Sequence, residues 1–360
     1  MKQSVLHQKH LQLKAKMTDF QGWQMPLQYS DIIDEYHAVR TAAGLFDVCC
    51  LGRIEIDGAG ASALLQRIFT RDLAKIPVGA ASYGLICSES GAILDNAMLF
   101  HLPADNRFLL STNAMNVDKI VQWLKKQATP DTLINDVTQS TVQLALQGPH
   151  SDRILAAFSD HHLKKMKPRT LKNLPFQEVT IMISRTGCTG EHGYELFAPA
   201  THAERLWNAV MEAGRDQGIL PCGYGSRNLL RLEMGFHLYG CELDETRTPL
   251  EAGLGSSVDF KKDFIGKDAL LKIKADGIRQ QLVGFELFEK GIPKTGGIIF
   301  SDSREVGVVT TGIHSPHCRK DIGLGYVTEK YAQPGQEIEI EVKDQEMTAK
   351  IVHLPFFRRK

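Results

Sequence analysis

The sequence has no surplus of either charge and no long apolar run. Its 360 residues include 42 Lys and Arg against 42 Asp and Glu, so the formal net charge is zero. Nucleic-acid binders usually carry a basic surplus, because neutralising phosphates supplies most of their affinity. No stretch approaches the ~20 apolar residues of a membrane-spanning helix. We therefore expect neither a nucleic-acid nor a membrane partner. The 43% share of hydrophobic residues is typical of a globular protein.

Targeting and metal signals are also missing. The first seventeen residues have no apolar signal core, and the first arginine is Arg40, which argues against a transit peptide. We expect a cytoplasmic protein. The seven cysteines show no CxxC spacing, which favours free and mostly buried thiols. His314, His317 and Cys318 lack a second ligand pair, so we expect no metal.

Nucleotide and nucleophile motifs fail as well. Gly58-Ala-Gly60-Ala-Ser-Ala63 looks like a dinucleotide fingerprint, but no βαβ unit or acidic strand end follows it. We interpret it as a plain turn from a strand into a helix. GxxxxGK[ST] and GxSxG are both absent.

Periodicity indicates an α+β protein, because helical and strand patterns do not alternate regularly. A strand is expected at 53–57, followed by a helix with an apolar stripe from Leu64 to Phe69. Val117, Ile120, Val121 and Leu124 predict a second helix. A third is expected to open at Thr201, with Glu204 completing a capping box and Leu206, Trp207, Val210 and Met211 facing inward.

The character of the sequence changes after residue 276. Strand-like runs at 281–288, 306–310 and 337–342 are separated by Gly-Gly, Ser-Pro and Pro-Gly turns, and the last run alternates strictly. We expect an N-terminal region over 1–275 and a C-terminal β-barrel domain over 276–360. That the N-terminal region is made of two interleaved lobes is implied by the resemblance described below.

One predicted hairpin brings polar groups together. A turn of Pro-Ala-Asp-Asn at 103–106 would pair Leu102 with Arg107, and counting back pairs Asn96 with Asn113. Asp95 and Asn113 would then lie side by side at the open end. A carboxylate and an amide there can hold a heterocycle that both donates and accepts hydrogen bonds. The alternative is that these polar residues only mark strand ends.

Read from end to end, the chain resembles the aminomethyltransferase family, the T-proteins of the glycine cleavage system. No single motif carries the resemblance, but the motifs run in family order from about residue 6 to 357. They are Asp19-Phe20-Gln-Gly22-Trp23, Gly44-Leu-Phe-Asp47-Val48, Gly91-Ala-Ile-Leu-Asp95, Ala145-Leu-Gln-Gly-Pro149, Arg185-Thr-Gly-Cys-Thr-Gly-Glu-His-Gly-Tyr-Glu195, Leu230-Arg-Leu-Glu-Met-Gly235, Leu238-Tyr-Gly240, Phe264-Ile-Gly-Lys267, Thr311-Gly312, Ser315-Pro316 and Pro355-Phe356.

The resemblance implies a three-lobed fold, in which residues 1–275 bind folate, and a tetrahydrofolate-dependent transfer. An aminomethyl group would leave the lipoyl arm of a partner, the H-protein, its carbon would pass to tetrahydrofolate, and ammonia would be released. By motif, Asp95 is the catalytic aspartate. Folate contacts are implied for the following residues, without deciding which arginine meets the glutamate end of folate: Tyr83, Asn113, Glu195, Arg231, Tyr239 and Arg358.

The chain departs from the family pattern at several positions. Cys188 stands where the family usually has tyrosine, Cys49-Cys50-Leu51 replaces Ser-His-Met, and Asn228 and Ser256 replace an aspartate and a tryptophan. These changes leave three interpretations. The chain is the aminomethyltransferase, a folate-dependent demethylase of a small methyl donor, or a folate-binding protein without transferase activity.

Overall fold

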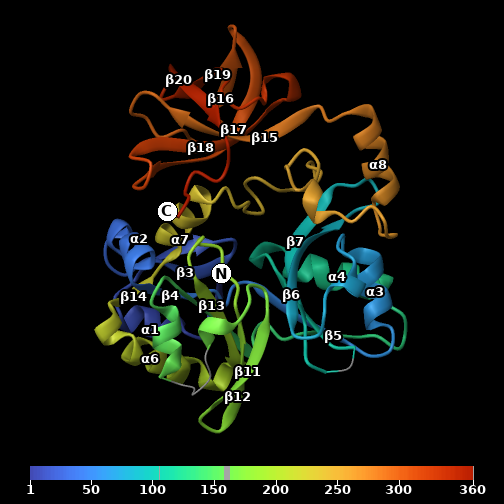
Figure 1. Cartoon of the computed structure of the whole chain (residues 1–360), viewed down its shortest axis with the longest axis vertical. Coiled ribbons are helices and arrows are strands. Elements are labelled where there is room, and N and C mark those ends of the chain that lie inside the picture. Colours follow the sequence, from blue (N-terminus) through green and yellow to red (C-terminus); the bar gives the residue numbers. More distant parts are fainter. Residues whose placement is uncertain (105, 158–162, 360) are drawn as a thin grey trace. The chain divides into compact units, whose positions relative to one another are not determined.

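The chain forms two compact units, each assembled from separated stretches of sequence. The computed structural model describes residues 1–104, 106–157 and 163–359 (Figure 1). The first unit holds residues 1–67, 71–84 and 96–228, and the second holds residues 68–70, 85–95 and 229–360. Each unit has its own hydrophobic core. The division at residue 275 stays a prediction.

Three sheets carry strands of the first unit. A small sheet has the order β1-β3-β2, a six-stranded sheet has the order β11-β12-β13-β10-β4-β14, and a five-stranded sheet has the order β6-β7-β8-β5-β9. Strands β6 and β7 continue into the second unit. The bounds are β1 (Lys2–Gln3), β2 (Lys16–Phe20), β3 (Trp23–Gln28), β4 (Ala43–Asp47), β5 (Gly52–Asp57), β6 (Ala80–Cys87), β7 (Ile93–His101), β8 (Phe108–Thr112), β9 (Leu133–Asp136), β10 (Thr141–Gln147), β11 (Leu171–Phe176), β12 (Val179–Ser184), β13 (Gly193–Pro199) and β14 (Ile219–Cys222).

Helices connect these strands. In the described part of the chain the α-helices are α1 (His7–Gln12), α2 (Ile32–Thr41), α3 (Ala61–Ile68), α4 (Val117–Gln127), α5 (Ser151–Ala156), α6 (Ala203–Ala213), α7 (Tyr224–Glu233) and α8 (Lys267–Asp276). The 3-10 turns are η1 (Leu73–Lys75), η2 (Ala114–Asn116), η3 (Leu163–Lys165), η4 (Ala200–His202), η5 (Arg215–Gln217), η6 (Gly255–Ser257) and η7 (Glu329–Tyr331). None of the described helices is long and apolar enough to cross a membrane.

The six-stranded sheet buries one apolar face against helix α6. Leu144, Leu146 and Leu196 alternate along β10 and β13, so they share that face. Leu206 and Trp207 of α6 pack into the same core. Because side chains alternate along a strand, the residues between these leucines are placed on the opposite face. The chemistry of the first unit is found on that second face.

The predicted helices are confirmed, but the capping box is wrong. Helix α4 buries Val117, Ile120 and Leu124 as its spacing indicates. Helix α6 begins at Ala203, and no side chain caps it. The preceding residues form the 3-10 turn η4, in which Thr201 bonds to His202 instead of capping the helix.

The turn at Gly58 is confirmed as a strand-to-helix connection. It joins β5 to α3, and Gly58 has a φ of +95°. A Cβ at Gly58 would lie 2.2 Å from the carbonyl oxygen of Asp131, so close backbone approach as well as the positive φ requires glycine here.

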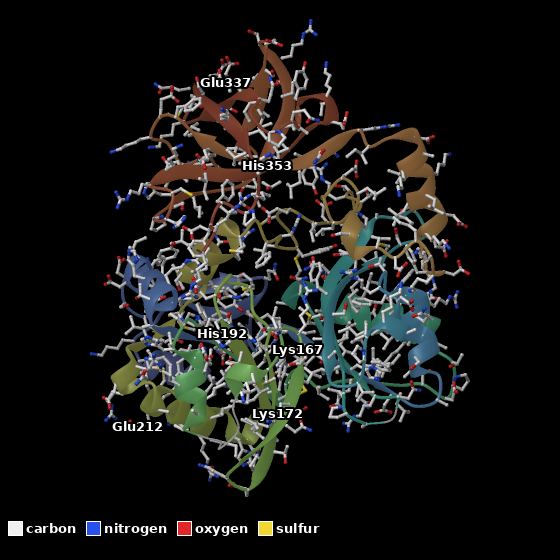
Figure 2. The ribbon with its side chains drawn as sticks, viewed as in Figure 1. Lys167, Lys172, His192, Glu212, Glu337 and His353 are labelled. Atoms are coloured by element: carbon white, nitrogen blue, oxygen red, sulfur yellow. The ribbon has the colours of Figure 1, made fainter. Side chains whose placement is uncertain are left out.

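The α+β class and the C-terminal barrel are also confirmed. Six strands, drawn in orange and red in Figure 1, close in the order β15-β18-β17-β16-β19-β20. In β19, Glu337 points outward, as Figure 2 shows, whereas Ile338 and Ile340 fill the interior. The bounds are β15 (Gln280–Leu287), β16 (Ile298–Ser301), β17 (Arg304–Ser315), β18 (Lys320–Thr328), β19 (Glu337–Val342) and β20 (Gln345–Val352).

We expect Phe285→Ala to destabilise the second unit by about 3–5 kcal/mol, because it removes a fully buried ring from the barrel core. The ring packs where Gly323 leaves room: a Cβ at Gly323 would lie 2.5 Å from it. Phe288→Ala is the matched control, since that ring is 56% exposed. Urea unfolding would measure both, and equal losses would contradict this account of the core.

Candidate functional site

The predicted hairpin has the predicted register. Strands β7 and β8 pair Met98 with Ser111 and His101 with Phe108, and Leu102 N–H donates to the carbonyl oxygen of Arg107 at 3.0 Å. Part of the expected turn, Asp105, lies outside the described residues. The register itself is confirmed.

Asn113 lies at the open end of this hairpin and is buried. Its side-chain Nδ2 donates to the backbone oxygen of Asn96 at 3.0 Å and to its side-chain Oδ1 at 2.9 Å. Asn96 directly follows Asp95 in the chain. The side chain of Asn113 therefore fixes the backbone position next to the predicted catalytic aspartate.

Asp95 belongs to the second unit, where it is fully buried. The segment before it is held by a loop of the same unit. Ile93 N–H donates to the carbonyl oxygen of Arg247 at 2.9 Å, and the Tyr239 hydroxyl donates to the carbonyl oxygen of Ile93 at 3.3 Å. Tyr239, predicted as a folate contact, thus supports the strand that carries Asp95.

Arg231 is committed to a buried ion pair in the second unit. Its Nη1 lies 2.7 Å from Oε2 of Glu242 and donates to the carbonyl oxygen of Phe236 at 3.0 Å. Glu242 also accepts hydrogen bonds from the Thr310 and Thr311 hydroxyls. Burial is the largest single influence and opposes ionisation of Glu242, but the charge of Arg231 and the hydrogen bonds to Glu242 together outweigh it and lower the pKa of Glu242. This guanidinium links α7 to β17.

Glu195 lies on the polar face of the six-stranded sheet. It pairs with Ala145 of β10 on one side and with Ser184 of β12 on the other. Oε1 accepts a hydrogen bond from Nε2 of Gln143 at 3.2 Å, and Oε2 accepts one from the Thr186 hydroxyl. Burial raises the pKa of Glu195, although these two donors and the charge of Arg227 oppose the rise.

Arg227 is the functional candidate that the sequence prediction missed. It lies one turn before Arg231 in α7, with its guanidinium 5.4 Å from the centre of the Tyr224 ring. Burial lowers its pKa, but Cys188, Tyr224, Cys50 and Glu195 together raise it above the usual value. Among the described residues no carboxylate forms an ion pair with Arg227, and its guanidinium donates to no acceptor. Its donors remain available.

The remaining predicted contacts differ in exposure. Tyr83, in the first unit, is half-buried, and its carbonyl oxygen accepts a hydrogen bond from Arg71 Nε at 3.2 Å. Arg358, in the second unit, is exposed. Cys188 is half-buried and, after burial, is the first of the neighbouring groups that shift the pKa of Arg227. Another departure, Cys50, is buried with its Sγ 2.8 Å from the Tyr224 hydroxyl.

A cleft of about 440 Å³ in the first unit contains none of these residues. It lies between the tip of the β7–β8 hairpin and strands β12 and β13, and Arg53 forms part of its lining. The guanidinium of Arg53 donates to the Thr141 hydroxyl and to four backbone carbonyl oxygens, so it has no donor left for a ligand. These carbonyl oxygens belong to Cys49, Leu51, Thr138 and Thr141. Within the described ranges, no three His, Cys, Asp or Glu side chains gather as a metal site.

Comparison with known protein families decides what this arrangement belongs to. Residues 6–262 match the family described as "GCVT N-terminal domain", and residues 280–358 match the "Glycine cleavage T-protein C-terminal barrel domain". The chain belongs to the glycine cleavage T-protein family. The two matches together extend over most of the chain.

Individual relatives agree over the full length. The chain is 42% identical to the aminomethyltransferase of Desulforamulus reducens, covering 100% of this chain and 99% of that protein. It is 41% identical to that of Geobacillus kaustophilus, with the same coverage. The crystal structure of glycine cleavage system aminomethyltransferase T from Bartonella henselae aligns with a TM-score of 0.92 at 29% identity, covering 99% and 98% of the two chains.

These findings confirm the first of the three interpretations. The fold is that of the T-protein family, the enzyme class is an aminomethyltransferase, and tetrahydrofolate is the co-substrate.

We expect Glu242→Gln to destabilise the second unit by about 3–5 kcal/mol, because it leaves the buried charge of Arg231 without its partner. The folded-state pKa of Glu242 is lowered, so the pair stabilises the unit above the pKa of an unfolded glutamate, about 4.3. The wild type should therefore lose stability as the pH falls through this region, and the variant should lose less.

Denaturant unfolding at pH 7 and pH 4 would measure this difference. Glu212→Gln is the control, because Glu212 pairs with Arg215 on the surface, where the two side chains are 64% and 70% exposed (Figure 2). An exposed pair contributes little. A Glu242 variant as stable as the Glu212 variant at pH 7 would contradict the structural role of the Arg231–Glu242 pair.

Proposed function

We propose that this T-protein takes the aminomethyl carbon from the lipoyl arm of the H-protein, passes it to tetrahydrofolate and releases ammonia, in the cytoplasm. One observation in this chain supports the proposal above all. Glu195 and Arg227 are opposite charges close enough to shift each other's pKa, yet they form no ion pair with each other. A ligand with donors and an acceptor on one edge satisfies both.

The pterin ring of folate has such an edge. Its amino group and ring N–H donate hydrogen bonds, and an ionised carboxylate is a pure acceptor, which suits Glu195. Its carbonyl oxygen accepts, which suits the donors of Arg227. We therefore assign the pterin edge to Glu195 and Arg227 and treat Arg231 as structural. Tyr83 and Asn113 are further contacts in this proposal.

Asp95 is the proposed catalytic residue. The reaction forms two carbon–nitrogen bonds to folate, and it breaks both the carbon–sulfur bond to the lipoyl arm and the carbon–nitrogen bond to the departing ammonia. Protons must therefore be held and moved near the reacting nitrogens. A buried carboxylate on a firmly held strand suits that task, because its position is fixed by the hydrogen bonds around Ile93 and Asn96. Arg358, exposed at the end of the chain, is the proposed contact for the glutamate tail.

We expect Asp95→Asn to lower single-turnover formation of ammonia and methylene-tetrahydrofolate by about 10²–10⁴-fold, since shape is kept and charge is lost. Tetrahydrofolate affinity should change much less. The substrate is aminomethylated H-protein, and the products are quantified after rapid quenching. Asp344→Asn, at an exposed barrel turn, is the control.

Turnover at the wild-type rate in Asp95→Asn would remove Asp95 from the catalytic role. Failure of the wild type with H-protein, together with folate-stimulated demethylation of a small donor, would transfer the proposal to the demethylase interpretation.

We expect Arg227→Ala and Arg231→Ala to separate binding from stability. Arg227→Ala should weaken tetrahydrofolate binding about 10–100-fold, because a charged hydrogen bond to the ligand is lost. Arg231→Ala should instead lower the free energy of unfolding, since Glu242 loses its partner. Calorimetric titration and urea unfolding measure the two effects. Unchanged folate affinity in Arg227→Ala would overturn its assignment.

A further inference from the structure

Gln143, on β10, bonds directly to the proposed folate-binding carboxylate. Building on the proposed function, we propose that Gln143 is a positioning residue that holds Glu195 in its charged, acceptor-only form and so sets the pH range over which this enzyme binds tetrahydrofolate. Gln143 is 1% exposed, so it acts on the ligand through Glu195 and not by contact.

The strand register places Gln143 for this role. Across the β10–β13 ladder Ala145 is opposite Glu195, and Gln143 is opposite Phe197. Gln143 and Glu195 are therefore diagonal neighbours on one face of the sheet, a separation that long side chains span. The short side chain of Ala145 leaves the space between them open. Nε2 of Gln143 crosses it to reach Oε1 of Glu195 at 3.2 Å.

The orientation of the Gln143 amide follows from chemistry. A carboxylate accepts but does not donate, so the NH₂ end must face Glu195 and the oxygen must face away. That oxygen, Oε1, is buried and has no hydrogen-bond partner among the described residues. An unsatisfied buried acceptor destabilises a fold. Support for Glu195, and not stability, is therefore what this glutamine supplies.

The second oxygen of Glu195 is held independently. The Thr186 hydroxyl donates to Oε2, and its oxygen lies 3.0 Å from the Ser184 hydroxyl. A hydroxyl has one proton, so Thr186 gives it to Glu195 and accepts one from Ser184. This series of hydrogen bonds ends on Oε2 of Glu195, and Oε1 accepts its hydrogen bond from Gln143. Each carboxylate oxygen thus has one protein donor.

The hydrogen bond from Gln143 is one of the few influences that keep Glu195 ionised. Burial raises the pKa of Glu195, and the Thr186 bond, the charge of Arg227 and the Gln143 bond oppose it. Arg227 comes from α7, and Cys188, Tyr224 and Cys50 act on Arg227 in turn. Strands β10 and β12 contribute uncharged Gln143, Ala145 and Ser184. Removing the Gln143 donor raises the pKa of Glu195 further, so Glu195 becomes protonated at a higher pH.

Gln143→Leu tests the proposal in the full-length enzyme, because leucine is similar in size and has no donor. Affinity for tetrahydrofolate is measured by anaerobic calorimetric titration from pH 5.5 to 8.5. We expect the variant to bind about tenfold more weakly than the wild type at pH 6 and within about twofold of it at pH 8.5. The melting temperature at pH 6 should not fall, since the unsatisfied oxygen is removed.

Two controls separate positioning from packing. Gln147→Leu changes an equally buried glutamine of the same strand, which bonds to the carbonyl oxygens of Thr186 and Tyr194 but not to Glu195. It should lower stability and leave the pH profile of binding in place. In a Glu195→Gln background, Gln143→Leu should add no pH dependence, because residue 195 no longer titrates.

The outcomes distinguish this proposal from the proposed function. A loss of affinity in Gln143→Leu that is uniform with pH, or an unchanged profile, overturns the role of Gln143 while folate binding by the wild type stands. A wild type that does not bind tetrahydrofolate at any pH overturns the proposed function itself.

Discussion

A buried carboxylate stays ionised only where hydrogen-bond donors surround it. In the first unit, the carboxylate of Glu195 has this need. One face of the six-stranded sheet carries leucines that pack against Trp207 of α6. The other face has to supply hydrogen bonds, which come from Gln143 and Thr186. Placing Ala145 opposite Glu195 keeps the space between these groups free. The alternation of the strands thus separates stability on one face from recognition on the other.

The two arginines of α7 illustrate the same requirement with opposite results. Arg231 meets Glu242, two threonine hydroxyls support that carboxylate, and the charge is neutralised within the second unit. Arg227 has an aromatic ring and the field of nearby groups, but no carboxylate at ion-pair distance among the described residues. A satisfied arginine stabilises, whereas one with free donors is ready for a ligand. Because the two arginines lie one turn apart in the same helix, their positions in the sequence do not show which one forms the ion pair and which one keeps its donors free.

Much of the fold could be predicted from local patterns. The strict alternation of β19 and the β7–β8 register were both predictable, because turn length and alternation alone determine them. The Thr201 capping box failed because a 3-10 turn takes up the residues that would have formed it. The motif resemblance points to Arg231 as a folate contact, and its burial in an ion pair could not be predicted, because its partner Glu242 lies in a loop whose path the sequence does not show. Gln143 could have been found from the sequence, because Gln143 and Gln147 lie on the same face of a mostly apolar strand, and this pattern indicates a buried polar face.

The divided sequence of the second unit has a consequence for how the protein is made. Leu85 and Ile93 pack in one core with Leu243, Phe264 and Leu270. During synthesis, Leu85 and Ile93 are therefore exposed long before the residues that cover them have been translated. Until then their apolar surface has no native cover, which is the condition under which nascent chains aggregate or recruit chaperones. A fragment that starts at residue 229 would contain the whole barrel, but it would lack Leu85 and Ile93, which share a hydrophobic core with Tyr239. Truncation is therefore a poor route to this unit, because its core also needs residues from 68–70 and 85–95.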